Sequence, residues 1–158
     1  MAAWLAGAAA LGAQDSTASL RTQFSHETNA VHKAKLMQHL GEAELQGILG
    51  AFKAGRLEDA EKDLSEYVGQ VQECSKALDD AHINADKHPD GFKQLQISVR
   101  EALRRLDPVI ARLDPSEQVP FAFWRKQLDD VDEHLFHQLF PRGPNGNAPP
   151  SAPKKQGP

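Results

Sequence analysis

Residues 92–113 read FKQLQISVREALRRLDPVIARL and contain one continuous apolar stripe with the period of an α-helix. Its members recur at spacings of three and four: Phe92, Leu95, Val99, Ala102, Leu103, Leu106, Ile110 and Leu113. Pro108 interrupts the stripe. Because proline lacks a backbone donor, we expect a kink near Asp107 or a break there, with Asp107 as a new N-cap. The stretch predicts a long amphipathic helix with one weak point.

Segments with the same periodicity lie on both sides of this stretch. They cover residues 19–27, 29–54, 57–81 and 121–139. Glycine and proline separate them, at Gly55, at the turn 89–91 and at Pro115. No segment alternates with the period of a strand. Long amphipathic helices joined by short links should pack antiparallel. The sequence therefore predicts an all-α fold of four long helices, either as a closed up-and-down bundle, which we favour, or as two stacked helical hairpins.

The two ends of the chain differ in composition from its middle. Residues 1–13 are almost all Ala, Leu, Gly and Trp, carry no charge and resemble an export signal cleaved after Ala13. The basic residues that begin such a signal are missing, so the alternative is a disordered or weakly helical apolar N-terminus. Residues 142–158 contain no large apolar side chain, which predicts a disordered tail.

These features divide the chain into a signal-like segment at 1–13, one helical domain at 14–141 and a disordered tail at 142–158. The apolar stretch is shorter than the roughly 20 residues that span a bilayer. We therefore expect an exported protein, periplasmic or secreted, with no membrane span in the mature chain.

Composition excludes several classes of function. The formal net charge of -4 argues against a general nucleic-acid binder, which needs a basic face. Cys74 is the only cysteine, so no internal disulfide can form, and its position on an apolar stripe predicts burial. No nucleophile, histidine and carboxylate form a recognisable catalytic motif, and no phosphate-binding loop is present. We predict a protein that is not an enzyme and needs no cofactor.

One turn favours the hairpin alternative. Gly55, Leu57, Ala60 and Leu64 match the second half of a tetratricopeptide repeat. The first half fits poorly and no second copy follows at the repeat period. The resemblance to a tetratricopeptide repeat is therefore limited to one helical hairpin.

A broader resemblance covers most of residues 30–142. It rests on the segments Gly91-Phe92-Lys93-Gln94-Leu95-Gln96-Ile97, Ala102-Leu103-Arg104-Arg105-Leu106-Asp107 and Leu139-Phe140-Pro141-Arg142. Together these resemble a group of uncharacterised exported bacterial all-helical proteins. The resemblance implies export and helices, and it implies no activity.

Two sets of residues are candidate sites. Asp130, His134 and His137 share one face of the last predicted helix and offer carboxylate and imidazole ligands for a metal. Lys93, Arg100 and Arg104, spaced by seven and four, form an outward ridge for an acidic partner or a phosphorylated ligand.

Two functions follow from these sites. We favour a non-enzymatic interaction or scaffold module whose partner is another protein. The alternative is a small helical bundle that binds a metal or another ligand between its helices.

Overall fold

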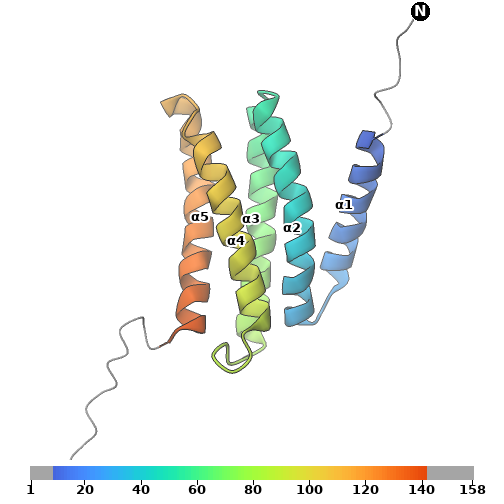
Figure 1. The fold of residues 1–158 in the computed structure, drawn as a ribbon, viewed down its shortest axis with the longest axis vertical. Helices are drawn as coiled ribbons and strands as arrows, with labels where there is room; N and C mark the ends of the chain where they lie inside the picture. The colour runs from blue at the N-terminus through green and yellow to red at the C-terminus, as the bar shows by residue number, and fades with distance from the viewer. Residues whose placement is uncertain (1–8, 142–158) are drawn as a thin grey trace, which may run out of the picture.

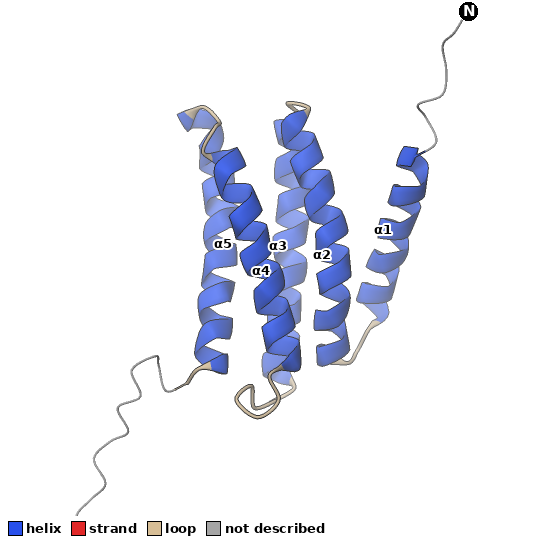
Figure 2. Ribbon diagram, in the orientation of Figure 1, coloured by secondary structure: helices blue, strands red, loops and turns tan. Residues whose placement is uncertain are grey.

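The computed structural model describes the backbone of residues 9–141 and side chains from Ser16 onward, and it is entirely helical there. Five helices follow in order: α1 (Ala9–His26), α2 (Ala30–Lys53), α3 (Leu57–Asp80), α4 (Asp90–Ile110) and α5 (Pro115–Leu139). Figure 2 shows helices and loops, with no strand in the described part of the chain. The all-α prediction is confirmed. The predicted tail at 142–158 and the first eight residues of the signal-like segment lie outside the described residues.

Local side-chain chemistry explains where several helices begin and end. Asn29 caps α2 by accepting a hydrogen bond from the backbone of His32 at 3.0 Å. Gly55 adopts a φ of 71°, which favours glycine and ends α2 as predicted. Asp114 and Glu117 form a capping box that starts α5 well before the apolar stripe begins at Phe121.

Pro108 does not split α4. The helix continues through it to Ile110. The proline lies in the last turn of α4, so the backbone hydrogen bond that it cannot donate removes support from only a few residues. Asp107 is a helical residue and not a new N-cap. Its carboxylate accepts hydrogen bonds from Arg125 of α5, at 2.6 Å from Nε and 3.2 Å from Nη2.

Successive helices run antiparallel, but neighbours in space are not always neighbours in sequence (Figure 1). The main packing pairs are α2 with α3, α2 with α4, and α4 with α5, followed by α1 with α2 and α3 with α5. In an up-and-down ring, α3 would pack closely on α4, and α2 on α5. Instead α3 and α4 form the weakest contacting pair, and the backbones of α2 and α5 do not approach each other.

The link between α3 and α4 accounts for this order. It covers residues 81–89 and is longer than the links at 54–56 and 111–114. Ala85 within it is buried, so the link packs against the domain rather than extending into solvent. This longer connection lets α4 start beside α2, and α4 then runs parallel to α2 (Figure 1).

The core lies between α2, α3, α4 and α5. Its largest fully buried side chains are Tyr67, Phe92, Phe121, Met37, Leu40, Leu45, Ile48, Leu64, Leu78, Leu95, Leu106 and Leu128. Cys74 is fully buried as predicted, and desolvation raises the pKa of its thiol to about 12. From α1, Phe24 is the only fully buried apolar side chain among the described residues.

Candidate functional site

The three residues of the predicted basic ridge are all exposed on α4, and they differ in their partners. Lys93 is exposed and forms no ion pair with any residue from 16 to 141. Arg100 pairs with Asp132 of α5, with Nε 2.9 Å from Oδ1, and lies over the ring of Phe136. Arg104 pairs with Glu101, with Nη2 2.6 Å from Oε1. Two of the three cations are therefore already engaged within the domain.

A different basic surface forms where α2 and α4 both end. A groove of about 650 Å³ separates these helix ends, and we call it the basic groove. Its lining residues are Leu49, Phe52, Lys53, Arg104, Arg105, Pro108, Val109, Arg112 and Leu113. Leu49, Phe52, Val109 and Leu113 are buried or half-buried and form its floor, whereas Pro108 and the cations Lys53, Arg104 and Arg112 are exposed. No acidic side chain lines the groove in the described part of the chain.

The four cations of the basic groove differ in their partners. Arg105 donates to both carboxylate oxygens of Glu42 at 2.9 Å. Hydrogen bonds from Gln46 and Arg105 lower the pKa of the Glu42 carboxyl. Arg104 likewise lowers the pKa of Glu101 through its hydrogen bond. Lys53 and Arg112 form no ion pair with a described residue, so their charges are available to a ligand.

The predicted metal ligands on α5 point to three different partners. Asp130 accepts hydrogen bonds from Lys126 at 2.7 and 2.9 Å. His134 lies with Nε2 2.9 Å from Asp79 of α3, and His137 lies 3.7 Å from Glu133. Between residues 16 and 141, no three His, Cys, Asp or Glu side chains are arranged to hold a metal ion. The structure therefore does not bring Asp130, His134 and His137 together as one ligand set.

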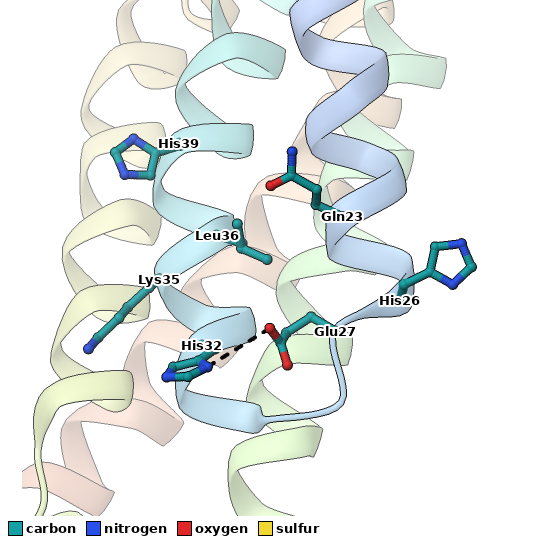
Figure 3. A pocket seen from close by; sticks show the side chains of 7 residues that line it. All are labelled: Gln23, His26, Glu27, His32, Lys35, Leu36 and His39. Carbon is teal, nitrogen blue, oxygen red and sulfur yellow. Dashed lines mark ion pairs between the residues drawn. The ribbon is translucent and has the colours of Figure 1, made fainter.

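A second cavity, of about 550 Å³, lies between α1 and α2 and contains several histidines. Figure 3 shows its lining residues: Gln23, His26, Glu27, His32, Lys35, Leu36 and His39. Glu27 points toward His32, with an ion-pair distance of 3.9 Å between its Oε2 and the ring Nδ1. The ring of His26 points away from that pair, and His39 lies further along α2 (Figure 3). The three imidazoles do not converge.

Sequence reasoning did not single out Lys53 or Arg112 as site residues. Both were visible as cations near the ends of predicted helices. Their significance depends on the packing of α2 beside α4, which periodicity alone does not specify. The signal that could have found them is the clustering of Arg104, Arg105 and Arg112 around Pro108.

Comparisons with protein-family models, with curated proteins and with solved structures gave no match to this chain. Within residues 9–141, no helix combines the length and apolar character needed to cross a membrane. The candidate site therefore rests on the geometry of the basic groove.

Proposed function

We propose that this chain is a non-enzymatic interaction module whose basic groove binds an acidic amphipathic segment of another protein. The observation behind this proposal is an apolar floor beneath four cations with no acidic lining residue. An amphipathic helix with an acidic edge complements both features, because its apolar face covers the floor and its carboxylates meet the rim.

The order of helix packing supports two stacked hairpins as the scaffold for this groove. The hairpin of α2 and α3 lies against that of α4 and α5, with α2 beside α4 and α3 beside α5. In this arrangement the ends of α2 and α4 come together, and the basic groove is formed by both hairpins. The tetratricopeptide-like turn at Gly55 joins the helices of the first hairpin.

We further propose that the protein is exported. The uncharged apolar composition of residues 1–13 and the resemblance to exported helical proteins both favour this location. The expected partner is then another protein of the cell envelope or the surroundings of the cell.

The first experiment measures binding of a synthetic acidic helix. The probe is a fluorescein-labelled peptide with leucines on one helical face and glutamates on the other, and the readout is fluorescence anisotropy. We expect binding that weakens as salt rises, because the rim charges are exposed and screened. Replacing Lys53→Glu and Arg112→Glu together should weaken binding by at least about tenfold, which corresponds to about 1.4 kcal/mol.

Lys35→Glu combined with Lys93→Glu provides the matched control. Both lysines are exposed, lie outside the groove and form no ion pair with a described residue. Each double variant replaces two cations with two glutamates, so the change in net charge is the same. We expect this control to bind the peptide nearly as well as the original chain does. Equal losses in both double variants would show attraction to overall charge and would contradict a specific groove.

A further inference from the structure

A carboxylate is buried beneath α1, at a surface separate from the basic groove. Glu44 of α2 is 5% exposed, and burying a charged group is costly unless it is paired and hydrogen-bonded. Its Oε1 accepts from Nε of Arg21 on α1 at 2.6 Å and from Nε2 of Gln70 on α3 at 3.0 Å. Arg21 is the one cation paired with Glu44 within the described residues. The helix α1 therefore neutralises a charge inside the domain.

Arg21 satisfies this site only in part. Oε2 of Glu44 and Oε1 of Gln70 are both buried and have no hydrogen-bond donor among the described residues. Each buried acceptor without a donor destabilises the fold, because no hydrogen bond offsets the loss of its contact with water. Arg21 directs its Nη2 toward Glu66 instead, at 3.7 Å, and 44% of its side chain is exposed. An arginine that approached Glu44 with two nitrogens would supply the missing donor to Oε2.

The aromatic residue three positions after Arg21 has its own recognition contact. The ring of Phe24 is buried, and Nζ of Lys33 on α2 lies over it, 4.7 Å from the centroid. Lys33 is itself buried and pairs with Glu73 of α3. The surface beneath α1 thus recognises an arginine and an aromatic ring at a spacing of three.

Between residues 18 and 26, the rest of the contact that α1 makes with the domain buries few side chains. The backbone of α1 approaches only α2, and α1 lies at the edge of the helix array (Figure 1). Cavities of about 550 and 540 Å³ lie along its contact with α2, one towards each end. Leu20 adds a half-buried contact to that of Phe24. The short link at residues 27–29 also keeps α1 at a high effective concentration beside this surface.

We propose that the surface beneath α1 is a helix-binding site and that α1 is exchangeable. The partner that it fits is a helix of another protein with arginine three residues before phenylalanine. Glu44 and Gln70 receive the arginine, and Lys33 receives the aromatic ring. The competing helix gains over α1 by giving a donor to Oε2 of Glu44.

The test uses the full chain with Arg21→Glu, which places a repelling carboxylate against Glu44 and weakens the hold of its own α1. The probe is a fluorescein-labelled peptide of residues 14–29, followed by fluorescence anisotropy. We expect this peptide to bind the Arg21→Glu chain at least tenfold more tightly than the unaltered chain, in which the attached α1 competes. The same peptide with its own arginine replaced by glutamate should not bind.

Two further chains keep the result interpretable. Arg56→Glu makes the same charge change at an exposed arginine paired with Asp59 and should behave like the unaltered chain. Phe24→Ala loosens α1 without adding charge, and this variant should also bind the peptide more tightly than the unaltered chain does. It keeps the proposal testable if the Arg21→Glu chain fails to fold.

Three outcomes would overturn the proposal. One is a folded Arg21→Glu chain that binds no peptide. Another is equal binding of the two peptides. The third is a dimer of the unaltered chain that Arg21→Glu abolishes, because the site would then serve α1 of a second copy.

Discussion

Cys74 is the residue whose environment makes the clearest chemical prediction. Burial raises the pKa of its thiol from 9.0 to about 12, so the reactive thiolate is roughly a thousandfold rarer at a given pH below 9 than in an unfolded chain. We expect the native protein to resist a thiol reagent such as DTNB at pH 8 and to react rapidly once unfolded in urea. Fast reaction of the native protein would contradict the burial of Cys74.

The same shift predicts how stability depends on pH. Below pH 9 the thiol keeps its proton in both states, so Cys74 has no effect on the pH dependence. Between pH 9 and about 12 only the unfolded chain releases the proton, which favours unfolding by up to about 1.4 kcal/mol per pH unit. In urea unfolding, the free energy of unfolding of the original chain should therefore fall relative to that of Cys74→Ala as the pH rises from 9 to 10.5. Burial also raises the pKa of Tyr67, which favours unfolding in the same direction. Both chains contain Tyr67, so its effect cancels in this comparison.

At the residue scale, sequence predicted the buried apolar positions better than the buried polar ones. Leu95, Leu106 and Cys74 lie on periodic stripes, and all are fully buried. Glu44 and Lys33 are buried because α1 covers them with Arg21 and Phe24. Periodicity along one helix contains no information about a cation supplied by another.

At the scale of single helices, two glycines predict opposite effects of the same substitution. A Cβ at Gly47 in α2 would meet nothing within 4 Å, whereas at Gly91 in α4 it would lie 2.8 Å from the side chain of Leu78 and 3.3 Å from the backbone of Val31. Gly47→Ala should stabilise the protein by about 0.5–1 kcal/mol through helix propensity. Gly91→Ala should destabilise it by about 1–3 kcal/mol through overpacking.

Chemical denaturation of the two alanine variants measures both effects. Each variant adds one methyl group, so each serves as the control for the other. A stabilising Gly91→Ala would mean that α4 approaches α2 less closely than the structure shows.

The bounds of the helices were predictable where caps and apolar stripes coincide. The segments expected at 29–54 and 57–81 match α2 and α3 almost to the residue. By contrast, α1 extends from Ala9 and includes the end of the signal-like segment, while the stripe predicted only residues 19–27. Most of the side chains of α1 that the structure describes, from Ser16 to His26, face solvent, and an exposed helix leaves little apolar periodicity to detect.

At the scale of the whole molecule, the order of helix neighbours lay beyond the sequence argument. Short links favoured an antiparallel ring, but the longer link at 81–89 lets α4 start beside α2. The basic groove follows from this placement, because Lys53 is the last residue of α2 and Arg112 lies just beyond the end of α4. The sequence shows Lys53 and Arg112 as separate cations, but it does not show that they line the same groove.

The uneven packing of the five helices predicts uneven protection across the molecule. Amide hydrogen exchange reports local opening, which costs least where few apolar contacts are lost. Between residues 16 and 26, α1 contributes Phe24 as its one buried apolar residue, and it approaches the backbone of α2 alone, whereas α4 packs against α2, α3 and α5. In exchange followed by mass spectrometry, peptides from residues 16–26 should therefore lose protection well before those from residues 92–106.

Arg21→Glu should speed exchange in α1 further and leave α4 unchanged, while Arg56→Glu should alter neither. Protection of α1 equal to that of α4 would mean that α1 opens only when the whole domain unfolds, and that its arginine and phenylalanine are permanent parts of the core.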